Sequence, residues 1–269
     1  MNDLEAFVRL VEALNPWSGK LVYVGGWAHR IHRLDPRASA PAHQAVFTKD
    51  TDLAFAAAEP IEGDIKAALE KSGFKEQLSG ESKPPVAQYT LGEEGQGFYA
   101  EFLTPLVGSG RKRTGEPDAT LAKAGITAQK IRHLDILLES PWVVTLRPEN
   151  APIQKPTDIK VANPLAFMVH KFLIQEQRTA KKRAQDILYI FDTIGVFGGQ
   201  MDEFQKMWKE TIGPALGKSR DDVLKLNEAT FSKVTDETRM AAQIPQDLKL
   251  TADDIRGTCQ YAFEQIFSA

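Results

Sequence analysis

The chain has 269 residues, of which 42% are hydrophobic and 26% charged, with a formal net charge of −3. This composition is typical of a globular protein with its own core, and it provides no general positive charge for nucleic-acid binding. One cysteine, Cys259, excludes a disulfide framework, and we expect it to pack inside a C-terminal helix. The acidic start and the lack of any apolar run of membrane length predict a cytoplasmic protein with no membrane partner.

The first 160 residues alternate between helical and strand patterns. Apolar residues at helical spacing predict a first helix, which Asn15-Pro16 ends. The other elements are predicted from apolar periodicity and from glycine and proline positions. We expect helices at 3–14, 27–34 and 60–72, strands at 21–24, 47–55, 74–78, 86–91, 98–103, 134–138, 142–146 and 159–161, and loops or turns at 35–45, 92–97 and 107–115.

The character of the chain changes at Asn163-Pro164, which predicts a helix start with asparagine at the cap and proline at the first position. Only helical patterns follow, at 165–177, 180–194, 201–212, 220–231 and 252–267. The sequence therefore predicts an α+β fold. A small mixed sheet flanked by helices occupies residues 1–160, and a helical domain occupies residues 161–269.

A glycine turn and two acidic residues stand out in the first part. Gly25-Gly26 follows an apolar strand and opens a helix, where exposed backbone N–H groups can hold phosphates. Asp50 and Asp52 lie on the next strand, and because side chains alternate along a strand, both face the same side. Two neighbouring carboxylates repel each other unless a cation lies between them, and magnesium is the usual cation for phosphate chemistry.

These two segments, Val24-Gly25-Gly26-Trp27-Ala28 and Lys49-Asp50-Thr51-Asp52-Leu53, resemble the signature of the polymerase-β-type nucleotidyltransferase superfamily. Within it, the chain is most similar to bacterial nucleotidyltransferase-fold proteins related to AbiEii-type toxins. The resemblance implies the minimal nucleotidyltransferase fold, a nucleoside triphosphate substrate and two Mg²⁺ ions held by Asp50 and Asp52.

The superfamily uses a third acidic residue from a nearby strand. Glu101 is the candidate, because it lies inside the apolar strand Phe98–Leu103 and a buried carboxylate needs a partner. A salt bridge or an edge position would also explain it, and Asp135 is the rival for the third carboxylate. The resemblance gives Asp50, Asp52 and Glu101 a catalytic and metal-binding role, and Gly25-Gly26 a nucleotide-binding role.

A second resemblance to the toxins lies in the helical part. Those proteins have a helical lysine, then an arginine, then a basic segment that ends in an aspartate, which here are Lys171, Arg178, Lys182 and Asp186. Lys171 and Arg178 are seven residues apart, so we expect them to lie on nearly one helix face and to contact the nucleotide phosphates. A lysine at a helix edge can also extend to solvent. Where the toxins have a second aspartate, this chain has Tyr189, which places the toxin role of Asp186 in question.

The implied function is Mg²⁺-dependent transfer of a nucleoside monophosphate from a triphosphate to an RNA, a protein or a small molecule. A toxin-like role would add an antitoxin as partner. The alternative is an inactive nucleotide- or RNA-binding protein with the same fold. Two basic clusters, Arg111-Lys112-Arg113 and Lys181-Lys182-Arg183, could contact phosphates or simply be solvated surface.

Overall fold

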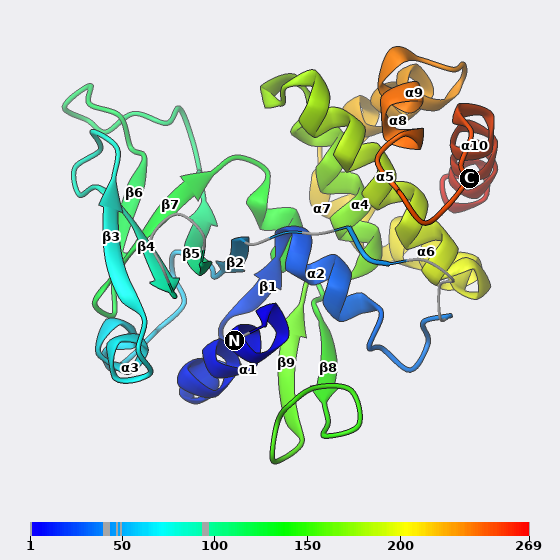
Figure 1. The fold of residues 1–269 in the computed structure, drawn as a ribbon. Coiled ribbons are helices and arrows are strands. Elements are labelled where there is room, and N and C mark those ends of the chain that lie inside the picture. Colours follow the sequence, from blue (N-terminus) through cyan, green and yellow to red (C-terminus); the bar gives the residue numbers. More distant parts are fainter. Residues whose placement is uncertain (1, 40–43, 47, 49, 93–96, 269) are drawn as a thin grey trace. The chain divides into compact units, whose positions relative to one another are not determined.

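The computed structural model describes residues 2–39, 44–46, 48, 50–92 and 97–268 (Figure 1). The chain divides into two compact units. The first contains Met1–Leu34 and Phe47–Ala162, and the second contains Asp35–Val46 and Asn163–Ala269. The predicted α+β class is confirmed, because a mixed sheet flanked by helices is followed by a helical region. The predicted turn at 92–97 lies largely outside the described residues.

Within the described residues, the first unit contains a nine-stranded mixed sheet. Seven strands form the order β3-β4-β5-β2-β1-β9-β8, while β7 pairs with both β5 and β6. Three pairs are parallel, namely β1 with β9, β2 with β5, and β5 with β7. The strands are β1 Val22–Val24, β2 Asp50–Ala54, β3 Lys75–Ser79, β4 Val86–Leu91, β5 Phe98–Pro105, β6 Thr120–Lys123, β7 Ile126–Ile131, β8 Trp142–Leu146 and β9 Thr157–Val161.

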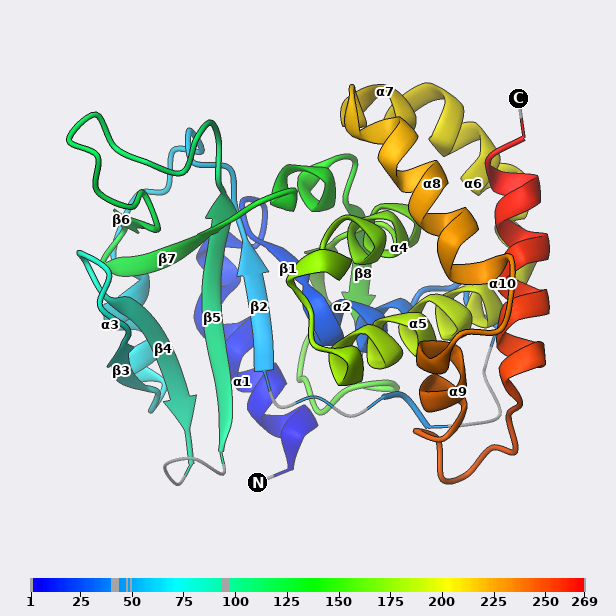
Figure 2. The same ribbon diagram turned by 90° about the horizontal axis from the view of Figure 1, so that it is seen from above.

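Three helices pack against this sheet, namely α1 Asp3–Leu14, α2 Gly25–His32 and α3 Ile65–Lys71. Figure 2 shows α1 and α3 behind the strands, on the same face. The contact between helices and sheet is aromatic. Phe7 of α1 stacks on Trp27 of α2 with ring centroids 4.2 Å apart, and Trp27 meets Phe98 of β5 edge-on at 5.7 Å. These rings cover Phe98 on one face of β5, while Tyr99 and Glu101 alternate onto the opposite face.

Two predictions in this unit are wrong, and two of its strands were not predicted. The apolar run at 134–138 forms a 3₁₀ helix, η2 Leu134–Leu138, rather than a strand. The third helix begins at Ile65 instead of residue 60, because the Asp64 side chain caps it by accepting a hydrogen bond from the Ala67 N–H at 2.9 Å. Strands β6 and β7 were not predicted, and β7 owes its place in the sheet to pairing with β5, which is distant in sequence.

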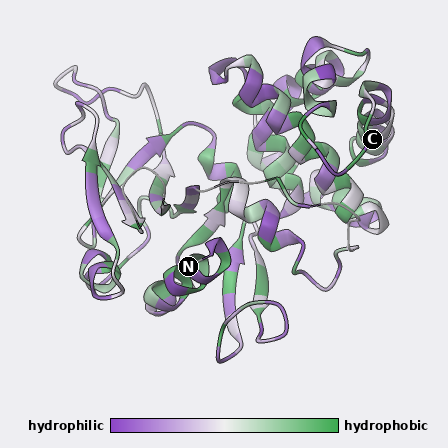
Figure 3. Ribbon diagram, in the orientation of Figure 1, coloured by the Kyte–Doolittle hydropathy of each residue, from purple (hydrophilic) through white to green (hydrophobic). Residues whose placement is uncertain are grey.

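The second unit is helical. Asn163 caps its first helix, as predicted, by accepting from the Ala166 N–H at 2.8 Å. Cys259 is buried in the last helix, as expected, and that helix alternates hydrophilic and hydrophobic residues (Figure 3). The main helices are α4 Pro164–Leu173, α5 Ala180–Val196, α6 Met201–Met207, α7 Gly213–Leu216, α8 Ser219–Phe231, α9 Asp236–Ala242 and α10 Ala252–Ile266, with short 3₁₀ turns η3 Gln175–Gln177 and η4 Gly198–Gln200 and the π-helical η5 Trp208–Ile212.

The segment Asp35–Val46 belongs to this second unit through specific bonds. The Ser39 N–H donates to the Val196 carbonyl at 2.8 Å, and Arg37 forms an ion pair with Glu203 at 3.1 Å. The Gln44 N–H donates to Asp247 at 2.8 Å. The helical unit is therefore built from two separate stretches of the chain. Among the described residues, no helix has both the length and the apolarity needed to cross a membrane.

Candidate active site

The turn from β1 into α2 is shaped by Gly25. Its φ of +65° lies in the left-handed region, which an L-residue adopts only with strain. A Cβ atom at this position would overlap Oδ2 of Asp52 and lie 3.1 Å from its Cγ. Val24 and Asp52 are direct partners in the β1–β2 ladder. The Asp52 carboxylate therefore occupies the space that the missing side chain leaves beside the glycine turn.

Strand β2 presents its two aspartates on one face. Asp50 and Asp52 are partly exposed, whereas Thr51 between them is fully buried, as strand alternation requires. The hydroxyl of Thr48 donates a hydrogen bond to Oδ1 of Asp50. Lys49, which belongs to the sequence motif, lies outside the described residues. The antiparallel pairing of β1 with β2 thus brings the glycine turn and both predicted acids together.

Glu101 lies on the neighbouring strand in the register that a shared site requires. Strands β2 and β5 are parallel, and Asp52 is paired with Glu101. Burial raises the pKa of Glu101 above its usual range, and the charge of Asp50 adds to the rise. A hydrogen bond donated by the Gln88 amide on β4 opposes this shift. The β2–β5 register thus places Glu101 on the same face of the sheet as Asp52.

Tyr99 lies in the same charged surroundings. It is the β5 partner of Asp50 and shares the face of Glu101, two residues further along the strand. Burial, together with the negative charges of Asp50, Glu101 and Asp52, raises the pKa of Tyr99 to about 12. The phenol therefore stays protonated at neutral pH, so it can donate a hydrogen bond but cannot act as a base.

Asp135 does not take the strand position that a third carboxylate would need. It lies in the 3₁₀ helix η2, and its side chain is exposed. Glu101 is the acid that the sheet aligns with Asp52. Neither Tyr99 nor Gln88 could be recognised from sequence, because their proximity to the acids depends on strand register.

The donor set has the chemistry that a hard divalent cation prefers, since it consists of carboxylate oxygens on one face of the sheet. Within the described part of the chain, however, no three His, Cys, Asp or Glu side chains are gathered in a metal-binding arrangement. Mg²⁺ commonly binds through one or two carboxylates and completes its shell with water and substrate phosphates. Asp50 and Asp52 fit that mode, with Glu101 alongside.

Comparison with known families agrees with this geometry. A family described as Nucleotidyltransferase matches residues 2–213, which is more than three quarters of the chain. The chain belongs to this nucleotidyltransferase family. The match includes β1, the glycine turn, β2 and β5, and continues through α4 and α5 of the helical unit. No match was found among curated proteins.

Membership of the nucleotidyltransferase family implies a transferase that takes a nucleoside triphosphate and passes on its monophosphate. Nucleotidyltransferases commonly use Mg²⁺, which is consistent with the carboxylates on β2. The narrower relation to AbiEii-type toxins stays a prediction, because the family match does not distinguish it.

In this nucleotidyltransferase, Lys171 and Arg178 lie in the helical unit and both contact Asp186. The Lys171 Nζ is 2.7 Å from Oδ1 of Asp186, and both side chains are more than 90% buried. The Arg178 Nε is 3.4 Å from the second oxygen, Oδ2. The Lys171 ammonium also lies over the rings of Phe167 and Tyr189, at 5.1 and 5.0 Å.

This arrangement corrects one expectation about the helical unit and excludes one alternative. Helix α4 ends at Leu173, so Lys171 and Arg178 do not share a helix face. Lys171 is held by Asp186, fifteen residues away on α5, and does not extend to solvent at a helix edge. Whether either residue also contacts a nucleotide remains a prediction, because this ion pair already accounts for the burial of Lys171.

Proposed function

We propose that this protein is a Mg²⁺-dependent nucleotidyltransferase whose site comprises Gly25, Gly26, Asp50, Asp52 and Glu101. The observation that carries the proposal is the position of the Asp52 carboxylate, in the space that Gly25 leaves open and in register with Glu101. This contact arises from strand pairing between distant residues: it places an acid against a glycine whose φ is positive, at the start of a helix.

The roles follow from the positions. The backbone N–H groups of Gly25 and Gly26 open α2 without a side-chain cap, so they are suited to hold the β- and γ-phosphates. Asp50 and Asp52 would hold two Mg²⁺ ions, and Glu101 would complete the site next to the attacking hydroxyl. When bound, Mg²⁺ supplies charge neutralisation and lowers the pKa of the attacking hydroxyl.

Glu101 needs to be ionised for this role. Because its pKa is raised, its carboxylate form is lost at a higher pH than for an exposed glutamate as the solution is acidified. Thr48 and Gln88 orient Asp50 and Glu101 through the hydrogen bonds that they donate. Tyr99 provides a neutral O–H group beside the carboxylates.

Lys171 and Arg178 belong to the proposal as nucleotide-phosphate contacts. Arg178 is the better placed of the two, since its side chain is about one-third exposed, whereas Lys171 is buried against Asp186. The acceptor is an RNA, a protein or a small molecule. The resemblance to AbiEii-type toxins extends the proposal to a cytoplasmic toxin-like role with an antitoxin partner.

The test is an incubation with each α-labelled triphosphate, Mg²⁺, total RNA and total protein, followed by measurement of label in each fraction. We expect transfer by the wild-type chain and a loss of about 100-fold or more in Asp52→Asn. Asp135→Asn is the matched control, since it removes the same charge from an exposed position outside the sheet, and it should keep wild-type transfer. Full Mg²⁺-dependent transfer by a folded Asp52→Asn variant would refute the metal assignment.

A further inference from the structure

A band of polar side chains runs from the proposed site across the sheet to its edge. It consists of two rows of cross-strand partners, each with one residue from β3, β4, β5 and β2. The rows of this polar band are Gln77, Gln88, Glu101 and Asp52, and Lys75, Thr90, Tyr99 and Asp50. Direct partners share a face of a sheet, so both rows lie on the face that carries the carboxylates. Every side chain of the band is exposed or partly exposed.

The glycine turn and Glu101 lie on opposite sides of strand β2. Val24, which precedes the turn, pairs with Asp52 from the β1 side, and Glu101 pairs with Asp52 from the β5 side. In the proposed transferase the triphosphate lies at the turn and the attacking hydroxyl lies next to Glu101. The rest of the acceptor therefore extends over β5, β4 and β3, which is the direction of the polar band.

The polar band keeps hydrogen-bond donors and acceptors for a ligand. Among the described residues, neither the Tyr99 phenol nor the Gln77 amide makes a hydrogen bond. Gln88 uses one N–H for Glu101, which leaves its carbonyl and its second N–H. Thr90 donates its hydroxyl to a backbone carbonyl of β3 at 3.3 Å, and its oxygen can still accept. Neutral groups that donate and accept are matched by hydroxyl groups, which do both.

Tyr99 adds an aromatic surface to the band. Its ring is partly exposed and, in the part of the chain that the structure describes, stacks on no other aromatic ring. A sugar ring has C–H groups on its two faces and hydroxyl groups around its edge. It can therefore lie on the phenol ring while its hydroxyls bond to the neighbouring amides.

The charge of the polar band disfavours an anionic acceptor. Three of its eight side chains are acidic, and its one cation, Lys75, lies on the edge strand β3. Three strand spacings separate Lys75 from Asp50, which is about 14 Å and exceeds the screening length of about 8 Å at physiological ionic strength. A bound triphosphate adds more negative charge. A polyanion such as an RNA end would be repelled here.

The basic cluster Arg111-Lys112-Arg113 lies beyond the other end of β5. Glu101 is near the start of this strand, and Pro105 ends it four residues later, about 13 Å away. The cluster follows, and Lys112 donates to the carbonyl of Lys83 at 3.4 Å, just before the antiparallel strand β4. The cluster is therefore at the end of the strands that the carboxylates do not occupy.

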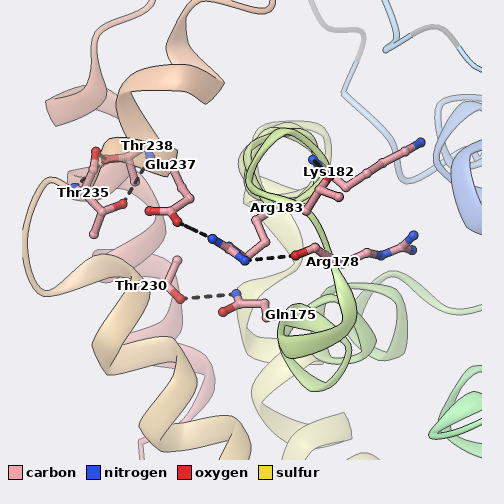
Figure 4. Close-up of polar contacts among 9 residues, drawn as sticks. Gln175, Arg178, Lys182, Arg183, Thr230, Thr235, Glu237 and Thr238 are labelled. Carbon is pink, nitrogen blue, oxygen red and sulfur yellow. Dashed lines mark hydrogen bonds and ion pairs between the residues drawn. The ribbon is translucent and has the colours of Figure 1, made fainter.

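The second basic cluster, Lys181-Lys182-Arg183, belongs to the helical unit, where Arg183 is already engaged. Arg183 donates to Oε1 of Glu237 from Nε and Nη2, at 3.3 and 2.9 Å, and to the Arg178 carbonyl from Nη1 at 2.9 Å. Figure 4 shows these contacts, with the Lys182 side chain directed away from them. Arg183 is therefore held by the packing of its own unit and is not available to an acceptor.

We propose, on the basis of the transferase function inferred above, that the acceptor is a neutral sugar bound along the polar band, with its ring on Tyr99 and a hydroxyl on Gln88. A sugar hydroxyl attacks the α-phosphorus of the triphosphate. The bond from that phosphorus to the oxygen that bridges to the β-phosphate breaks, pyrophosphate leaves, and the hydroxyl proton passes to water. Gln77 lies two strand spacings from Glu101, about 10 Å, so it contacts a second sugar unit.

The first test asks which acceptor takes up label. The full chain, Mg²⁺ and each α-labelled triphosphate are incubated with a panel of neutral mono- and disaccharides, and in parallel with total RNA and with total protein. We expect a labelled product of low mass that resists ribonuclease and protease. Label in RNA or protein alone would overturn the sugar proposal and leave the transferase function standing. No transfer to any acceptor would contradict both.

A matched pair of acceptors tests the charge argument. The best neutral sugar of the panel is compared with its phosphate ester, which has the same ring and a negative charge. We expect the ester to be the poorer acceptor by about tenfold or more in kcat/KM, because the band repels anions. Equal or better use of the ester would overturn the assignment of an uncharged acceptor.

A matched pair of variants tests whether the sugar lies on the polar band. Tyr99→Phe should raise the KM for the sugar about fivefold and leave the KM for the triphosphate unchanged, because one hydrogen bond is lost on the acceptor side alone. Tyr89→Phe is the control, since its hydroxyl bonds to Glu76 at 3.1 Å on the opposite face, and it should keep both KM values. An unchanged KM for the sugar in Tyr99→Phe, or an equal rise for both substrates, would overturn the proposal.

Discussion

The side chain that Gly25 lacks decides where Asp52 can lie. The glycine combines a left-handed φ of +65° with a position where a Cβ would overlap the Asp52 carboxylate. Either property alone would favour glycine. The second also means that a side chain at position 25 would displace Asp52, which is a proposed metal ligand. A substitution here should therefore affect activity more than stability.

We expect Gly25→Ala to lower the free energy of unfolding by about 1–3 kcal/mol and to reduce transfer strongly, because the new methyl group displaces Asp52. Urea unfolding and the labelled-triphosphate assay measure the two effects. Gly19→Ala is the control, since a Cβ there has no neighbour within 4 Å. If Gly25→Ala kept normal transfer, the position of Asp52 against the turn would not matter for activity.

Glu101 illustrates a conflict between stability and function. Its raised pKa means that folding becomes less favourable as pH rises through that pKa, because the ionised form is poorly solvated. Glu101→Gln should therefore raise the melting temperature at neutral pH and abolish transfer. The gain should disappear at acidic pH, where wild-type Glu101 is protonated.

Thermal unfolding of both proteins between acidic and neutral pH measures this difference. Asp135→Asn is a suitable comparison, since its carboxylate is exposed. A stability gain that is the same at every pH would show that desolvation of the Glu101 charge is not its cause.

At the scale of elements, a buried ion pair joins α4 to α5. Asp186 contacts two cations, Lys171 at 2.7 Å and Arg178 at 3.4 Å. Asp186 therefore has a second partner, whereas the only ion pair recorded for Lys171 among the described residues is the one with Asp186. Loss of Asp186 leaves a buried ammonium without its carboxylate, whereas loss of Lys171 leaves the carboxylate facing Arg178. The cost of removing one partner should therefore depend on which partner is removed.

We expect Asp186→Ala to destabilise the protein by about 3–5 kcal/mol and Lys171→Met by less. The double variant Lys171→Met/Asp186→Leu should recover most of the loss, and urea unfolding of all three measures it. Asp236→Ala, which breaks an exposed pair with Arg239, should cost no more than about 1 kcal/mol. Transfer by a stable double variant that equals wild type would exclude Lys171 from nucleotide binding.

The elements that sequence predicts well are those determined by local patterns. Helix α1 was predicted from the spacing of its apolar residues, and the turn from β1 into α2 was predicted from its glycines. Both patterns are local in the sequence. The strand predicted at 134–138 was wrong, since a buried 3₁₀ helix and a buried strand can have the same apolar composition. Strand β7 was missed because its pairing with β5 is a long-range property.

The candidate site was predictable to a similar extent. Asp50 and Asp52 share a face through alternation alone, so their pairing followed from sequence. The alignment of Glu101 with Asp52 depends on the β2–β5 register, and the bond from Gln88 depends on the β4–β5 register. The contact between Lys171 and Asp186 joins two helices, and no sequence spacing indicates it.

At the scale of the whole molecule, neither unit is a single stretch of chain. Residues 35–46 leave the first unit and contribute to the helical one, although a single boundary near residue 160 would assign them to the first. Their bonds reach Val196, Glu203 and Asp247, which are far apart in sequence. The helical unit therefore depends on a segment encoded more than 100 residues before its main part.

We expect a fragment of residues 163–269 to be less stable than the same fragment preceded by residues 35–46 through a flexible linker. The reason is that the bare fragment lacks the bonds to Val196, Glu203 and Asp247. Hydrogen exchange followed by mass spectrometry should show faster exchange at the end of α5 in the bare fragment. Equal protection in both fragments would mean that the segment adds nothing to the unit.

The environment of Tyr99 gives the protein an internal optical indicator. Its pKa of about 12 depends partly on the charges of Asp50, Asp52 and Glu101. Any cation that neutralises those charges makes the phenolate easier to form, and phenolate absorbs at longer wavelength than phenol. An alkaline absorbance titration with and without Ca²⁺, which stays dissolved at this pH, therefore reports occupancy of the carboxylates without substrate or label. The same titration of Tyr99→Phe subtracts the signal of the four other tyrosines.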